Sequence, residues 1–162
     1  MMRLTSSELR DFLRYSRELR RSSAVRGMHR FSQHGGTDTY CHCERVALLS
    51  YWLCRRLRLH ADLGSVVRGA YLHDFYLYDW HEPDRCHRLH GYRHPAAALC
   101  NADRHFSLNS IERDIISKHM WPLTLTKLPR YRESAVVCFA DKWCALLETL
   151  RRPKRPAFEG DI

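Results

Sequence analysis

The chain has 162 residues and a formal net charge of +9 at pH 7, a length that favours one globular domain with a substantial core. Hydrophobic residues make up 44% and charged residues 28% of the sequence, which excludes a disordered or fibrous protein. No apolar run approaches the roughly 18 residues that a membrane-spanning helix needs, and the first residues do not form a signal sequence. We therefore expect a single domain over residues 1–162, located in the cytoplasm, with no contact with a membrane.

The strongly basic charge is compatible with two classes of partner, nucleic acids and small phosphorylated molecules. Denser basic runs occur at residues 17–21, 55–58 and 151–155, but no recognised nucleic-acid-binding module accompanies them. We interpret most of these residues as solvated surface, so that nucleic acid is the less favoured partner.

Apolar residues recur at the spacing of an α-helix over most of the chain, and no alternating run is long enough to indicate a strand. In chain order, the expected helices cover residues 6–21, 40–59, 61–75, 95–105, 109–119 and 131–151. This pattern predicts an all-α fold, a single-domain helical bundle with its core at about residues 34–148. A basic helix within residues 1–26 precedes that core, and a flexible basic tail at 151–162 follows it.

Capping residues and polar stretches predict where these helices begin and end. Ser6 or Ser7 is expected to cap the first helix. Pro95 is expected to occupy the first helical position of the fourth helix, with His94 at its cap. Polar stretches that contain glycine are expected to be loops, and these are residues 27–38 and 82–93. The second loop would lie over the site.

Histidine and aspartate residues recur on the inward faces of successive expected helices, and iron, manganese and zinc prefer these residue types. His42, for example, lies on the apolar stripe of its helix. A buried Asp141 would cost several kcal/mol unless a cation or a dense set of hydrogen bonds accompanied it. Adjacent residues on a helix diverge by about 100°, which suits His73 binding one ion while Asp74 bridges it to another. The expected metal ligands are His42, His73, Asp74, His94, His119 and Asp141, with His90 as the alternative to His94.

Five segments carry these residues, and together they resemble one protein family. They read "YCHCERVALLSYWL", "RGAYLHDF", "RLHGYRHPAAAL", "DIISKHMW" and "CFADKWCALLE". The first, second and fifth resemble the first-histidine, His-Asp and final-aspartate helices of the HD-domain metal-dependent phosphohydrolase superfamily, over about residues 34–148. The other two are similar to the additional histidine segments of members that bind two metals. The HD-GYP branch of this superfamily does not fit, because Arg93 rather than proline follows Gly91 and Tyr92.

The resemblance implies a small stand-alone hydrolase of about six main helices that holds two divalent ions, Fe or Mn first and Zn or Mg as alternatives. Asp74 and His73 would be the catalytic residues, with Asp74 bridging the ions and orienting the attacking water. The expected substrate is a nucleotide or another small phosphorylated metabolite. The cations expected to hold its phosphate are Lys118, Lys142, Arg132 and Arg45. The chain could also form an oligomer.

Two further functions stay open at this point. Some HD-fold proteins with six ligands use the same set to activate dioxygen, so a di-iron oxygenase is the second hypothesis. A non-catalytic basic module that binds RNA or DNA with a steep salt dependence is the third. His34, Asp79 and His81 lie close to the motifs in sequence and are left open as substrate contacts.

Overall fold

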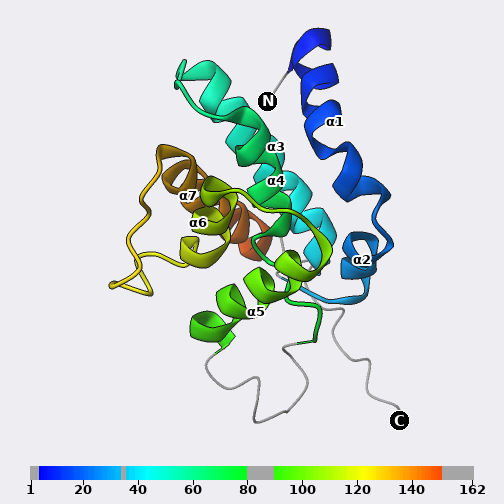
Figure 1. Ribbon diagram of the computed structural model, residues 1–162, viewed down its shortest axis with the longest axis vertical. Coiled ribbons are helices and arrows are strands. Elements are labelled where there is room, and N and C mark those ends of the chain that lie inside the picture. The colour runs from blue at the N-terminus through cyan, green and yellow to red at the C-terminus, as the bar shows by residue number, and fades with distance from the viewer. Residues whose placement is uncertain (1–3, 34–35, 80–89, 151–162) are drawn as a thin grey trace, which may run out of the picture.

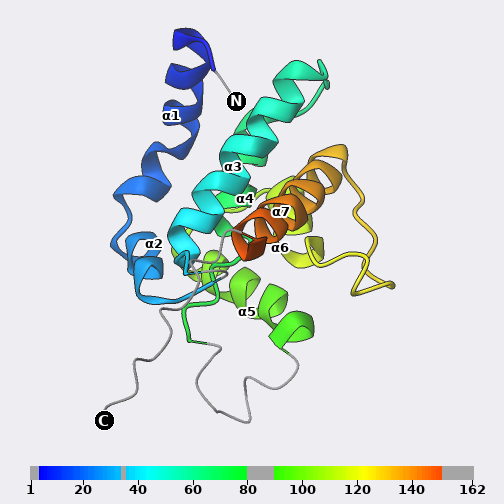
Figure 2. The same ribbon diagram turned by 180° about the vertical axis from the view of Figure 1, so that it is seen from behind.

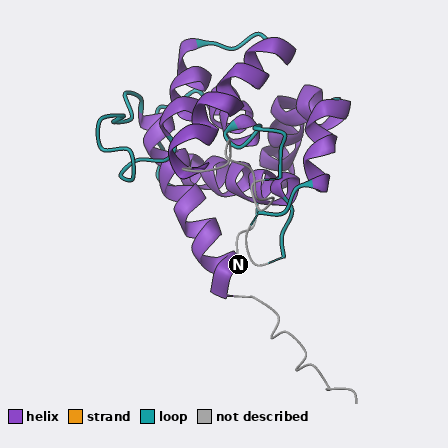
Figure 3. Ribbon diagram, turned by 90° about the horizontal axis from the view of Figure 1, so that it is seen from below, coloured by secondary structure: helices purple, strands orange, loops and turns teal. Residues whose placement is uncertain are grey.

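The computed structural model describes residues 4–33, 36–79 and 90–150, and this part of the chain is helical. Its elements are α1 (Ser6–Arg21), α2 (Ser23–Arg26), the short 3-10 helix η1 (Gly27–Arg30), α3 (Thr39–Arg56), α4 (Leu63–Leu72), α5 (His90–His105), α6 (Ser110–Lys118) and α7 (Arg132–Leu150). Within these residues there is no strand, and one isolated antiparallel bridge joins Ser32 to Asp38 (Figure 3). The expected all-α class is confirmed.

Helices α3 and α4 form the centre of the bundle (Figures 1 and 2). Helix α1 packs against α4 on one side, α6 and α7 lie on the other, and α5 packs on α6. The side chains where these helices meet are fully buried, and examples are Val46, Val66, Ile115 and Val137. Each of these helices therefore turns one face to a shared apolar core, as the helical spacing of apolar residues predicts.

The cap of α1 differs from the expected one. Thr5 forms a capping box: its hydroxyl accepts a hydrogen bond from the Glu8 N–H at 3.3 Å, and Glu8 accepts one from the Thr5 N–H at 2.8 Å. The expectation of a cap at Ser6 or Ser7 is wrong, because the box requires the acidic residue three positions after the cap. The bounds of the helix itself, residues 6–21, are confirmed.

The segment after α1 contains more helix than its polar composition indicates. Ser22 caps α2 by accepting a hydrogen bond from the Val25 N–H, and η1 follows directly. Val25 and Met28 are fully buried. The expected loop at 27–38 is therefore wrong for residues 27–30, because two apolar side chains in so short a helix are too few to establish a helical period.

Helix α5 begins at His90, so the expected start at Pro95 is wrong. Pro95 is the sixth residue of the helix, where its missing N–H leaves only the Gly91 carbonyl without its helical donor. A proline at the first position of a helix is a preference rather than a requirement. Residues 90–93 of the expected loop at 82–93 are thus helical, and the rest of that loop lies outside the described residues.

The expected tail at 151–162 also lies outside the described residues. Among the residues that are described, none of the helices is at once long and apolar enough to cross a bilayer.

The crossing of α4 and α6 depends on the absence of a side chain at Gly69. A Cβ atom at this position would lie 2.6 Å from Ile115 Cδ1 and 3.0 Å from Ile115 Cβ. Overpacking of this kind lowers the free energy of unfolding by about 1–3 kcal/mol. The higher helix propensity of alanine raises it by at most about 1 kcal/mol. We expect Gly69→Ala to lower the free energy of unfolding by about 1–2 kcal/mol, measured by urea denaturation.

Gly27→Ala is the matched control, because a Cβ there has no atom within 4 Å and the backbone already has a φ of -59°. It should be neutral or stabilising by less than about 1 kcal/mol. If Gly69→Ala were as stable as Gly27→Ala, the close contact between α4 and α6 would be refuted.

Candidate metal centre

Six histidine and aspartate side chains from five helices meet at one point in the interior. In chain order, α3 supplies His42, the end of α4 supplies His73 and Asp74, α5 supplies His94, the end of α6 supplies His119, and α7 supplies Asp141. None of the six is more than 7% exposed. The structure therefore brings together all six residues that the sequence predicts as metal ligands.

Two of the histidines lie at helix ends rather than inside helices. His73 follows the last residue of α4, and His119 follows the last residue of α6. In both, Nδ1 donates to the carbonyl three residues earlier, from His73 to Ala70 at 2.7 Å and from His119 to Ile116 at 2.9 Å. These carbonyls are among those that a helix end leaves without a donor. The bond places one ring proton on Nδ1 and directs each Nε2 into the cluster.

The surroundings of His119 keep its ring neutral, so that Nε2 carries a lone pair. Burial, together with the positive charge on His73, lowers the pKa of His119 to about 3. His119 is therefore neutral at pH 7, which is the form that binds a metal.

The outer nitrogen of His42 binds a carboxylate that the sequence analysis did not predict as part of the site. Glu148 accepts a hydrogen bond from His42 Nδ1 at 2.9 Å, and Arg45 binds the other oxygen of Glu148 at 3.0 Å. On the opposite edge of the ring, His42 Nε2 lies 3.1 Å from Asp141 Oδ1. A carboxylate that orients the outer nitrogen of a histidine is the usual support of a metal ligand. The available signal was that Glu148 lies seven residues after Asp141, two turns along the same face of α7.

Asp74 lies between two groups of imidazoles. Its Oδ2 accepts a hydrogen bond from Gln33 Nε2 at 2.6 Å and lies 3.4 Å from His73 Nε2. Its Oδ1 lies 3.1 Å from His94 Nε2 and 3.5 Å from His119 Nε2. Gln33 was missed because it lies in a stretch without helical period, where nothing in the sequence indicates that it faces inward.

Two inner atoms of the cluster, among the described residues, lack the hydrogen-bond partners that buried polar atoms normally have. Within the described part of the chain, neither His73 Nε2 nor Asp74 Oδ1 has an assigned hydrogen-bond partner, and Asp74 Oδ1 lies 3.1 Å from His94 Nε2. The Nε2 atoms of His94 and His119 also approach to 2.7 Å. An unpaired buried polar atom costs about 1–3 kcal/mol, and a cation between these atoms would remove that cost.

The donor set also suits a cation. The ligand atoms form three overlapping buried groups in which all atoms lie within 4.8 Å of one another: His42, His73 and Asp74; His73, His119 and Asp141; and Asp74, His94 and His119. Imidazole nitrogen and carboxylate oxygen are donors that iron, manganese and zinc accept. These clusters could therefore hold metal ions.

The ionisation states of the carboxylates and imidazoles also favour a cation in the cluster. Burial would raise the pKa of Asp74 and Asp141, but the neighbouring imidazoles outweigh burial and hold both pKa values well below the usual range. Burial lowers the pKa of His42, yet its hydrogen bonds to Asp141 and Glu148 raise that pKa to about 10. The charge of Asp74 likewise raises the pKa of His73 against the effect of burial. Two ionised carboxylates thus require positive charge beside them, from protons or from metal ions.

The four cations predicted to bind substrate lie at different distances from this cluster. Lys142 is adjacent: its Nζ donates to the His119 carbonyl and lies 3.2 Å from Asp141 Oδ2. Arg45 is bound to Glu148, and Lys118 forms an ion pair with Asp114 at 2.6 Å. Arg132 is the first residue of α7, nine positions before Asp141 and about 13 Å along the helix axis. Lys142 is therefore the cation that the structure brings to the cluster.

The other open candidates are placed only in part. His94, which the sequence analysis preferred to His90, contributes its side chain to the cluster. His90 begins α5, and its side chain lies outside the described part, as do His34 and His81. Asp79 is half-buried, five residues after Asp74.

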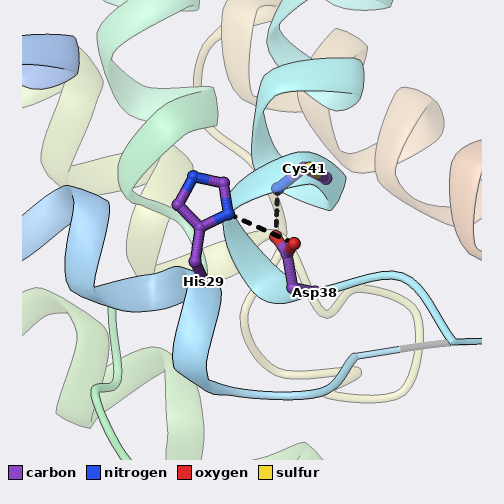
Figure 4. Close-up of side chains that lie close together, drawn as sticks. All are labelled: His29, Asp38 and Cys41. Carbon is purple, nitrogen blue, oxygen red and sulfur yellow. Dashed lines mark hydrogen bonds and ion pairs between the residues drawn. The ribbon is translucent and has the colours of Figure 1, made fainter.

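A fourth group of potential ligands lies near the surface, where α3 begins (Figure 4). Asp38 caps α3 by accepting from the Cys41 N–H at 2.7 Å, and its other oxygen lies 3.2 Å from His29 Nδ1. The side chain of His29 is 48% exposed. Helix capping and a surface hydrogen bond account for this group, so we assign no metal to it.

The comparisons with known proteins leave the family open. No family model matches the chain, and no solved structure matches it. A stretch of 55 residues is 40% identical to part of the succinylglutamate desuccinylase of Pseudomonas syringae pv. tomato. That stretch is 33% of this chain and spans 16% of the length of the desuccinylase. So short a match carries neither a fold nor an activity over to this chain.

The role of Glu148 can be tested by its removal. We expect Glu148→Ala to weaken Mn²⁺ binding about 10-fold to 100-fold, because His42 loses the group that orients it. Glu148→Gln should lose less, since the amide oxygen still accepts from His42 Nδ1. The measurement is competition with a chelating dye.

Glu44→Ala is the control for this series, because Glu44 lies in α3, two residues after His42, and its carboxylate binds Arg20 and Tyr71 instead of a predicted metal ligand. It should bind Mn²⁺ as the unaltered protein does. Equal affinities for Glu148→Ala and Glu44→Ala would refute a positioning role for Glu148.

Metal binding should depend on pH. The pKa of His42 is about 10, and that of His73 is well above its usual value. Both rings are therefore doubly protonated and positively charged at pH 7 when no metal is bound. Metal must displace these protons, so affinity rises with pH by about tenfold per unit for each proton released. Calorimetry with Mn²⁺ at several pH values, in buffers of different ionisation enthalpy, measures both quantities. A pH-independent affinity without proton release would contradict these protonation states.

Proposed function

We propose that this protein is a metal-dependent phosphohydrolase that acts on a nucleotide or another small phosphorylated metabolite. The observation that carries the proposal is the buried cluster, in which His73 Nε2 and Asp74 Oδ1 have no hydrogen-bond partner among the described residues. The order of the ligands along the chain, which resembles that of HD-domain phosphohydrolases, supports hydrolysis of a phosphate ester or anhydride. The net charge of +9 favours an anionic substrate.

The site would hold two ions, either Fe or Mn, with Asp74 shared between them. The two oxygens of Asp74 support this allocation, because Oδ1 lies beside His94 and His119 while Oδ2 lies beside His73. His42, His73 and Asp141 would hold one ion, and His94 and His119 the other. When bound, such ions supply Lewis acidity, which lowers the pKa of water and withdraws charge from phosphoryl oxygens.

The chain's own residues position these groups and the substrate. Gln33 fixes the Asp74 carboxylate by binding Oδ2 and leaves Oδ1 directed at the imidazoles. Lys142 is half-buried beside Asp141, where its ammonium group would bind a phosphate oxygen through a charge-assisted hydrogen bond. Burial of the ligands excludes bulk water, so electrostatic interactions with the phosphate are stronger than they would be in solution.

The test is metal analysis and phosphate release with anaerobically purified protein. We expect metal bound to the protein, and release of inorganic phosphate from nucleoside monophosphates or related esters that depends on Mn²⁺ or Fe²⁺. Asp74→Asn should lose both, because the shared carboxylate becomes a neutral amide with a weaker oxygen donor. Circular dichroism establishes that the variant is folded.

Asp103→Asn is the matched control, since Asp103 binds Arg113 near the surface, away from the cluster. It should retain metal and activity. Oxygen consumption that depends on an added substrate, without phosphate release, would favour the di-iron oxygenase instead. RNA or DNA binding that survives Asp74→Asn, in a protein without metal, would favour the basic binding module.

A further inference from the structure

The outer side of α7 carries a ridge of large apolar side chains that face solvent. Phe139, Trp143, Leu146 and Leu150 are 57%, 47%, 51% and 72% exposed. Their spacing of four, three and four residues is the 3.5-residue repeat of a helix that packs against another helix. The rings of Phe139 and Trp143 are stacked, with centroids 6.3 Å apart. We call these four residues the outer ridge of α7.

A groove lies on each side of the outer ridge. One, of about 440 Å³, lies between α7 and the segment before it, and its walls include Trp121, Leu128 and Phe139. The other, of about 360 Å³, lies between α7 and α3, and Trp52 and Trp143 line it. Figure 2 shows α7 facing outward between these two parts of the chain. A ridge flanked by grooves is the surface that a second such ridge fits, because helices pack with ridges in grooves.

The apolar area is large enough for a stable interface. The ridge together with Trp121 and Leu128 is about half exposed; at roughly 200 Å² for each side chain, the six expose on the order of 600 Å². This is the upper end of the largest apolar patch on a typical monomer, about 300–600 Å². With a polar rim, it approaches the roughly 800 Å² per partner of a standard interface.

The charges around the outer ridge are already paired within the chain. Lys142 beside one groove binds Asp141, and Arg45 beside the other binds Glu148. The acidic residues of α7 are all buried: Glu133, Asp141 and Glu148. The ridge therefore offers little charge to attract an unlike partner, and little to repel a copy of the same chain, whose net charge of +9 would otherwise oppose self-association.

We propose that the outer ridge of α7 is a homodimer interface, in which two copies of α7 pack antiparallel about a two-fold axis. A two-fold interface uses the same patch on both copies, and here each ridge enters a groove of the partner. The outer ridge faces away from the metal cluster, which lies on the inner side of the same helix, and Lys142 and Glu148 line the grooves between the two. Dimer formation requires no bound metal and no substrate.

Sedimentation velocity of the full chain, from about 1 to about 100 µM, tests the proposal because dimer formation follows mass action. The expected result is a dimer in this range. Leu146→Glu places an unpaired charge at the centre of the interface in both copies, and should weaken the dimer on the order of 100-fold or more. Phe139→Glu is a second variant with the same expected effect.

Leu57→Glu is the matched control, because Leu57 is 63% exposed at the end of α3. It should dimerise as the unaltered chain does. A dimer that Leu146→Glu and Phe139→Glu leave intact would overturn the proposal by placing the interface elsewhere. A chain that is monomeric throughout would also overturn it. In that case, a lower Tm of Leu146→Glu would indicate that the chain's own residues 151–162 cover the outer ridge. An unchanged Tm would indicate that a different protein covers it.

Discussion

The buried carboxylates of Asp74 and Asp141 impose the main electrostatic constraint on this structure. An ionised carboxylate without compensation costs several kcal/mol in a protein interior, yet both are nearly inaccessible to solvent. The fold meets the cost by directing histidines from α3, α4, α5 and α6 at the two carboxylates. Protons on His42 and His73 can supply the positive charge, and metal ions can supply it at the same atoms. The helix arrangement is therefore organised around a requirement for cations.

The supporting contacts hold these candidate ligands in a fixed geometry. The outer edge of each well-placed group is bound to something other than the cluster: His73 and His119 to backbone carbonyls, His42 to Glu148, and Asp74 to Gln33. Each such bond selects one tautomer or one carboxylate orientation, and among the described residues it leaves His73 Nε2 and Asp74 Oδ1 without a hydrogen-bond partner. A set of histidines that only neutralised two carboxylates would not need inner atoms that lack partners.

Helical periodicity predicted much of this arrangement from the sequence. His42 and Asp141 lie inside long helices, where a period of 3.6 residues determines which side chains face the core. His73 and His119 lie where helices end, and their bonds to backbone carbonyls compete with continuation of the helix, a balance that periodicity does not contain. Gln33 is beyond the reach of such a pattern because its position depends on tertiary contacts with Asp74 and Tyr76.

Helix α7 shows how one element can serve the site and a surface at once. Its apolar residues are distributed on both sides, and a helix that is apolar all round is normally buried all round. Within the described chain only one side is covered, the one that carries Asp141 and Glu148 against His42. Covering the other side would restrict the motion of the helix that supplies a ligand and its support. The residues that hold His42 and those of the outer ridge are therefore coupled through the rigidity of the same helix, and Glu148 lines the same groove as Trp143.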